Sequence, residues 1–189
     1  MAFIGEDMMY YDCSPAPKTS QERHNPASAS DSEQPGFSEL VILGAQGSTT
    51  GTSTSDQLEA LIGPVRVIEP TSSEAHSSLR DLLSSNDPLP PRVLLKLRHL
   101  EADQLPESTG ALVAELARAG FTLIGSDLRT SEWSALRSIG SHLAEQGVFF
   151  LEGLDLSAVP AGDYVLIALP VPINGSARCP VRVVLKSVF

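Results

Sequence analysis

The fold class follows from residues 148–170, which read Val148-Phe149-Phe150-Leu151-Glu152-Gly153-Leu154-Asp155-Leu156 and continue through Pro160 to Tyr164-Val165-Leu166-Ile167-Ala168-Leu169-Pro170. Two apolar runs, 148–151 and 164–169, are bounded by Gly and Pro and predict two strands. The carboxyl group of Glu152 comes directly at the end of the first run. This stretch therefore predicts a strand, a turn and a second strand, with an acid at the junction.

Further elements alternate along the rest of the chain. Apolar runs predict strands at Leu40–Leu43, Val65–Ile68, Arg92–Leu97 and Phe121–Ile124. Apolar residues at helical spacing predict helices over Ser73–Leu83, Ser108–Ala119 and Thr130–Gln146, the last two ending at a glycine. Such alternation predicts an α/β domain with parallel or mixed strand pairing.

Four segments resemble the cyclase family, which includes bacterial kynurenine formamidase and isatin hydrolase. Residues 150–170 resemble the family's stretch in which a ligand Glu precedes a turn and a strand ending Ile-Ala-Leu-Pro, and residues 180–185 resemble its last strand. Residues 36–43 and 63–68 match the strands on either side of its metal-binding motif. The resemblance implies an α/β domain of the swivelling β/α/β type, with a mixed, partly barrel-like sheet flanked by helices.

We expect two regions, an N-terminal arm over residues 1–35 and the cyclase-like domain over 36–189. Residues 14–34 are rich in Ser, Pro, Ala and charge, which predicts a partly flexible or extended segment. Met8–Tyr11 is apolar and is expected to dock on the body or on a second subunit. The resemblance implies a homodimer or homotetramer, with this N-terminal segment exchanged between subunits.

The family's metal motif, His-Thr-Gly-Thr-His-x-Asp-x-Pro-x-His, has lost its ligands here. With Gly47 as the anchor, the ligand positions fall on Ala45, Thr49, Gly51 and Ser55. None of these side chains has an imidazole or a carboxylate, and a catalytic zinc site normally has three protein ligands.

Two later family ligands, a His and a Glu twelve residues apart, correspond to Gly140 and Glu152. His142 is near the first position but faces about 200° away on a helix. The sequence therefore predicts neither a bound metal nor another cofactor.

The candidate catalytic residues are Glu152, His142 and Asp127. Burial raises the pKa of a carboxyl group in general, which suits a general acid or base near neutral pH. A structural role for Glu152, capping the next turn or pairing with an Arg, has equal weight. Asp127 follows a strand and is more often structural in the family, while His142 takes part only if the register shifts.

The candidate substrate-binding residues come from two segments. The Gly/Ser/Thr-rich loop has backbone N–H groups that suit an anion, and guanidinium groups suit a carboxylate. A plain flexible loop, a solvated helix face and core packing of the Trp are the alternatives. The residues are Gly47, Ser48, Thr49, Ser53, Arg129, Arg137 and Trp133.

Composition predicts a cytoplasmic protein that binds neither nucleic acid nor membrane. The net charge is −10, and both of those partners are polyanions. No apolar run reaches the ~20 residues of a membrane-spanning helix, and the N-terminus lacks a signal-peptide pattern. Two cysteines predict reduced thiols, with Cys179 in a loop.

Two functions of different classes remain at this stage. The first is a metal-independent enzyme of specialised metabolism that performs ring closure, dehydration or isomerisation on a small aromatic or carbonyl compound. The second is an inactive pseudoenzyme that binds a ligand or serves as a scaffold. A third, weaker hypothesis is a metal-dependent amide or lactam hydrolase with non-standard ligands.

Overall fold

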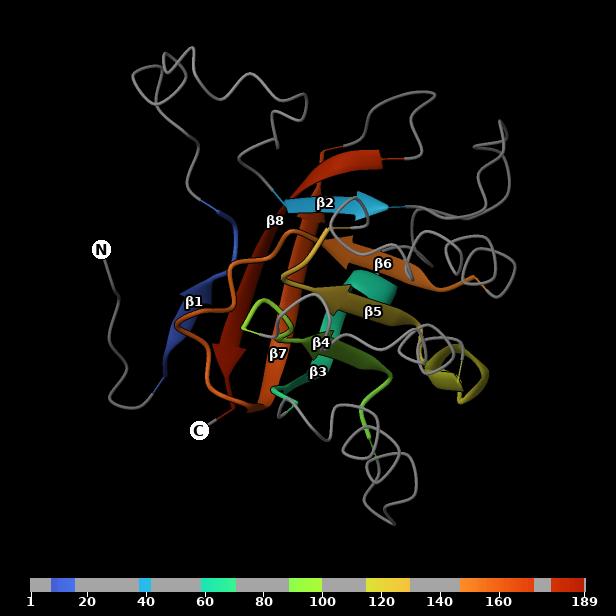
Figure 1. Cartoon of the computed structure of the whole chain (residues 1–189), viewed down its shortest axis with the longest axis horizontal. Helices are drawn as coiled ribbons and strands as arrows, with labels where there is room; N and C mark the ends of the chain where they lie inside the picture. Colours follow the sequence, from blue (N-terminus) through green and yellow to red (C-terminus); the bar gives the residue numbers. More distant parts are fainter. Residues whose placement is uncertain are drawn as a thin grey trace.

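The computed structural model (Figure 1) describes residues 8–15, 38–41, 59–70, 89–99, 115–129, 147–171 and 178–188. Within these ranges the structure has eight strands: β1 (Tyr10–Asp12), β2 (Ser38–Val41), β3 (Ile62–Ile68), β4 (Arg92–Leu95), β5 (Leu123–Ser126), β6 (Phe149–Glu152), β7 (Gly162–Pro170) and β8 (Arg178–Ser187).

The strands form one mixed sheet that closes on itself. The order is β1-β8-β2-β6-β5-β4-β3-β7, and β7 also pairs with β8. Neighbours from β3 to β6 are parallel, whereas the pairs that involve β1, β2, β7 or β8 are antiparallel. Figure 1 shows β7 and β8 as long strands side by side, with the shorter strands stacked across them. The predicted mixed, partly barrel-like sheet is confirmed.

All seven segments predicted as strands overlap β2 to β8, with ends that differ by up to several residues. Residues 115–118 are helical, within the helix predicted over 108–119, and Gly120 ends it with φ of 92°. The helices predicted over 73–83 and 130–146 lie outside the described residues.

Burial differs between the two halves of the sheet. Every residue of β4, β5 and β6 is buried, as expected for parallel strands covered on both faces. Along β7, buried and more exposed residues alternate, so that only one face points into the core. The sheet therefore positions the ends of three buried parallel strands next to one another.

The segment that begins at Met8 docks on the body of its own chain. β1 pairs with β8, with Tyr11 opposite Leu185. Cys13 follows β1, is completely buried, and donates its backbone N–H to the Val183 carbonyl at 2.9 Å. Residues 16–37 lie outside the described residues.

Both cysteines are free and buried. The prediction that Cys179 lies in a loop was wrong, because Cys179 is in β8, opposite Leu40 of β2. Its neighbour Pro180 suggested a loop, but β8 continues through this residue. Burial, with the nearby Asp12 and Asp155 charges, raises the pKa of the Cys13 thiol to about 12, which leaves it protonated at neutral pH.

No helix among the described residues is long and apolar enough to cross a membrane.

Gly125 of β5 leaves no room for a side chain. A Cβ built at Gly125 would collide with Leu94 Cδ2 and lie 3.3 Å from Leu151 Cβ and from Leu154 Cδ1. Gly125→Ala is therefore expected to lower the free energy of unfolding by about 1–3 kcal/mol, because these buried side chains must leave their preferred rotamers. Urea unfolding measures the change, and an unchanged midpoint would show that Leu94 repacks freely.

The Arg66–Asp163 pair joins β3 to β7. Arg66 Nε and Nη2 donate to the two Asp163 oxygens at 2.7 and 2.8 Å, and the Asp163 side chain is 45% exposed. The Arg66 hydrogen bond lowers the pKa of Asp163 from its ordinary 3.8, and burial opposes this.

Because the folded-state pKa of Asp163 is the lower one, the pair's contribution is complete above pH ~4 and is lost as the pH falls through the folded-state pKa. Asp163→Asn is expected to cost about 0.2–1 kcal/mol at pH 7 and less at pH 2. Urea unfolding at both pH values tests this. The matched Asp12→Asn, in the more exposed pair with Arg182, should change less.

Candidate active site at the carboxyl ends of the parallel strands

The ends of β4, β5 and β6 place charged residues along one edge of the sheet. Because the strands are parallel, the residues that follow them lie side by side: Lys96–Arg98, Asp127–Arg129 and Glu152–Gly153. Ligands of α/β sheets commonly bind outside the carboxyl ends of strands. We therefore take this edge as the candidate active site.

Glu152 is the last residue of β6 and is only 1% exposed. The turn after it is fixed from two sides. The N–H groups of Gly153 and Leu154 donate to the carbonyls of Leu128 and Ser126, each at 3.2 Å. The buried Ser38 hydroxyl lies 3.3 Å from the Gly153 carbonyl oxygen. The strand end that carries the carboxyl group is thus held by β5 and β2.

Arg129 lies against this same turn. Its side chain is 6% exposed, and a Cβ built at Gly153 would lie 2.7 Å from Arg129 Nη2 and 2.8 Å from Cζ. Gly153 has φ of 68°, a conformation that glycine adopts without strain. The missing side chain of Gly153 therefore provides the space that the guanidinium occupies at the turn after Glu152.

Asp127 is buried and bonded to the backbone. Its Oδ1 accepts the Leu97 N–H at 2.8 Å and the Arg98 N–H at 3.1 Å. Burial raises the pKa of the Asp127 carboxyl group, and these two hydrogen bonds oppose the rise. Because the carboxylate binds two N–H groups after β4, the contacts support the structural role weighed for Asp127.

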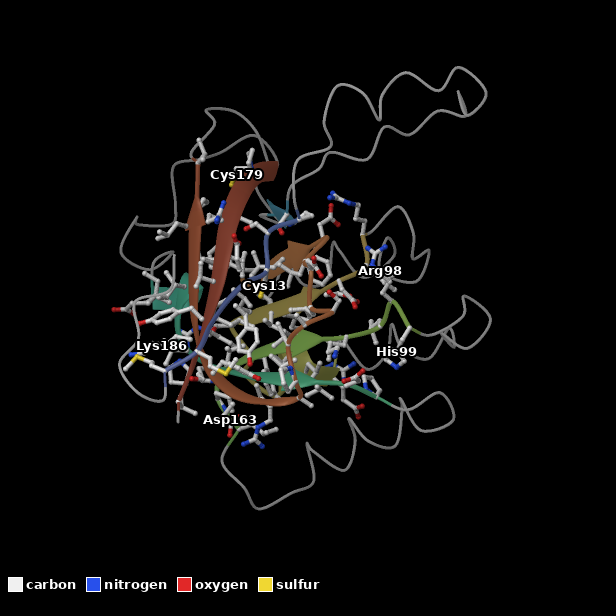
Figure 2. All side chains as sticks on the ribbon, turned by 90° about the vertical axis from the view of Figure 1, so that its left-hand side faces the viewer. Cys13, Arg98, His99, Asp163, Cys179 and Lys186 are labelled. Carbon is white, nitrogen blue, oxygen red and sulfur yellow. The ribbon has the colours of Figure 1, made fainter. Side chains whose placement is uncertain are left out.

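The far end of the edge carries two further polar contacts. Lys96 Nζ lies 2.8 Å from Glu69 Oε2 and donates to the Val159 carbonyl at 3.0 Å. The His99 ring bonds the Pro70 carbonyl at 2.9 Å, with Nε2 as the donor because a carbonyl only accepts. Figure 2 shows Arg98 and His99 close together on one side of the molecule, with Cys179 and Lys186 on the other.

The structure thus brings together three of the predicted site residues, Glu152, Asp127 and Arg129, at one sheet edge. The other predicted site residues lie outside the described residues: His142, Gly47, Ser48, Thr49, Ser53, Arg137 and Trp133. Sequence reasoning missed Gly153 and Ser38, which shape the turn after Glu152. The sequence signal for Gly153 is its position directly after the candidate acid Glu152.

The described residues do not fit the family's metal site. Among them, no group of three or more His, Cys, Asp and Glu side chains is placed to hold a metal ion. Asp127 uses its carboxylate for backbone N–H groups, and the guanidinium of Arg129 lies next to the residue after Glu152. A fixed cation there opposes a second one by like-charge repulsion.

A different anchor for the motif gives a similar result. With Gly51 as the anchor, Thr50-Gly51-Thr52 matches the motif's Thr-Gly-Thr, and the ligand positions become Thr49, Ser53, Ser55 and Glu59. Only Glu59 has a metal-binding side chain of the kind the motif uses, and one carboxylate does not replace three imidazoles and an aspartate.

Comparison with curated proteins finds kynurenine formamidases among the relatives of this chain. The chain is 34% identical over 139 residues to a kynurenine formamidase of Polaromonas naphthalenivorans, 36% over 155 residues to one of Paracidovorax citrulli, and 32% over 136 residues to one of Delftia acidovorans. The matches cover 68%, 75% and 69% of this chain. They span 60%, 69% and 65% of the relatives' own lengths.

Solved structures show the same fold. A potential metal-dependent hydrolase with cyclase activity superposes with a TM-score of 0.62 at 18% identity, covering 95% of this chain and 98% of the other. An isatin hydrolase bound to the product analogue thioisatinate gives 0.56 at 12% identity, covering 95% and 92%. No protein-family profile matches the chain. On the sequence identity to the kynurenine formamidases and the shared fold, the chain belongs to the cyclase family.

Proposed function

We propose that this chain is a metal-independent enzyme of the cyclase family, in which Glu152 transfers protons on a small aromatic or carbonyl compound. The observation that carries the proposal is the position of Glu152, buried at the carboxyl end of β6 with the guanidinium of Arg129 beside the following residue. The loss of the family's ligand types at the motif positions supports proton transfer by a side chain instead.

The reaction classes that suit such a site are ring closure, dehydration and isomerisation. Each removes a proton at one position and adds a proton at another, and one carboxyl group can carry out both steps in turn. A positioned acid or base contributes about 10²–10⁴-fold to the rate. That is enough for a substrate whose acidic C–H bond is next to a carbonyl group.

The substrate class is inferred from the names of the relatives. Kynurenine and isatin are both aromatic compounds with a carbonyl group on or next to the ring, and relatives named for each share this chain's sequence or fold. An aryl ketone is therefore the first class to test. We expect chemistry at a carbonyl compound rather than hydrolysis of an amide.

An inactive scaffold is the second candidate, and the 1% exposure of Glu152 favours it, since a buried carboxyl group can be purely structural. Proton exchange separates the two. The full-length protein is incubated with kynurenine in D₂O, and loss of the CH₂ protons next to the ketone is followed by proton NMR.

We expect exchange above the buffer rate, because Glu152 removes a proton to give the enolate and returns a deuteron from solvent. Binding without exchange, for kynurenine and a panel of aryl ketones, would support the scaffold.

Metal content tests the remaining alternative. Elemental mass spectrometry of untagged protein is expected to find far less than one zinc or manganese per chain. Stoichiometric metal, together with isatin hydrolysis that a chelator abolishes, would contradict the proposal and indicate a metal-dependent hydrolase with non-standard ligands.

A further inference from the structure

Two arginine side chains are buried in the described part of the molecule, Arg92 at 7% exposure and Arg129 at 6%. Arg92 binds backbone carbonyls: its Nε donates to Ala60 at 2.7 Å, its Nη1 to Pro64 at 3.3 Å, and its Nη2 to Glu59. This arginine shows that backbone oxygens can satisfy a buried guanidinium in this fold.

Arg129 is placed differently, against the residue that follows a buried acid. Its guanidinium lies on Gly153, the residue directly after Glu152, and Glu152 is itself 1% exposed. A buried carboxylate is costly unless an opposite charge or hydrogen bonds compensate it. An arginine whose guanidinium reaches such a carboxylate supplies both.

The surroundings increase the need for a cation. Asp127 follows β5, and Asp155 lies three residues after Glu152. The guanidinium of Arg98 donates to the backbone carbonyl of Asp127. Acidic residues therefore come from two segments around the end of β6.

We propose that Arg129 is the positioning residue of this site: its guanidinium compensates the buried carboxylate of Glu152 and fixes the Glu152–Gly153 turn. The role in catalysis rests on the proposed function of Glu152, whereas the charge compensation can be measured without any substrate. Arg129 acts through Glu152. The missing side chain of Gly153 leaves the space for the Arg129 guanidinium.

A double-mutant cycle on thermal stability tests the proposal. Arg129→Met leaves a buried carboxylate without its counter-charge and is expected to lower the Tm by about 10 °C. Glu152→Gln in the Arg129→Met background removes that charge and should recover at least a third of the loss. Arg129→Lys keeps the charge and should retain most of the stability.

Arg92→Met is the matched control, a buried arginine whose hydrogen bonds go to backbone carbonyls. Arg92→Met should lower the Tm as strongly as Arg129→Met does. The changes in Tm caused by Arg92→Met and Glu152→Gln should be additive. Additive effects of Arg129→Met and Glu152→Gln would overturn the proposal. If Arg129→Met does not fold, folding of Arg129→Lys supports the role of the charge, and failure of both variants contradicts it.

The two hypotheses fail separately. If Arg129 and Glu152 are coupled in stability but the wild-type protein exchanges no protons, the charge compensation is supported and the proposed function is contradicted. If the protein exchanges protons but the two residues are not coupled, Glu152 remains the acid–base group and the positioning role of Arg129 is contradicted. If both hold, Arg129→Lys should exchange kynurenine protons faster than Arg129→Met, measured well below the Tm of each variant.

Discussion

Glu152→Gln is expected to slow proton exchange on the aryl ketone probe by about 10²–10⁴-fold. Glutamine has nearly the same shape as glutamate, so it fills the same place at the end of β6, but it cannot take up and return a proton at neutral pH. The rate of deuterium incorporation per protein molecule, followed by NMR, measures the effect. Circular dichroism and gel filtration report whether the fold and the assembly are kept.

Glu69→Gln provides the matched control for this result. Glu69 follows β3 at the same edge of the sheet, and its side chain is 42% exposed and paired with Lys96. The substitution should leave the exchange rate within about twofold, because an exposed carboxylate is stabilised by water and does not depend on the site. Equal losses for the two variants would show that Glu152 has no special role. Loss of assembly alone in Glu152→Gln would support the scaffold.

The second large effect is expected at Asp127, on stability rather than on turnover. Asp127→Ala removes the acceptor of the Leu97 and Arg98 N–H groups, bonded at 2.8 and 3.1 Å. The buried Leu97 N–H left without a partner costs about 1–3 kcal/mol and the part-buried Arg98 N–H costs less, so the free energy of unfolding should fall by about 2–4 kcal/mol. Urea unfolding at pH 7 measures the difference.

Asp127→Asn separates the hydrogen bonds from the charge. The amide oxygen still accepts both N–H groups, and burial, which raises the pKa of Asp127, opposes the charge that the substitution removes. We expect its stability within about 1 kcal/mol of wild type, with proton exchange retained. If Asp127→Asn abolished exchange while remaining stable, Asp127 would be a catalytic residue. Accepting the N–H groups of residues 97 and 98 would then not be its whole role.

The elements of the fold were predictable because each strand has a local signature. Buried strands read as short apolar runs, and Gly or Pro marks where the runs stop. The segments around Val65–Ile68 and Tyr164–Leu169 were located within a few residues for this reason. Cys179 was misplaced because the neighbouring Pro180 suggested a loop, whereas the pairing of β8 with β2 decides its conformation.

The candidate site was predictable only in part. Glu152 could be found because a carboxyl group directly follows an apolar strand. Arg129 was found as a charged residue, but its position against Gly153 depends on how the turn after β6 packs on the end of β5. The partners of Asp127 are about thirty residues away in the chain, so no local pattern indicates them.

The sequence by itself determined the residue types available for chemistry: the motif positions lack the family's ligand set, and an acid stands at the end of an apolar strand. The tertiary structure decided which of these residues meet, because contacts across parallel strands join segments that are distant in the chain. It placed the Arg129 guanidinium beside the residue after Glu152 and used the Asp127 carboxylate for the backbone after β4. It also closed the sheet through β7 and β8, since pairing depends on where the strands lie in space.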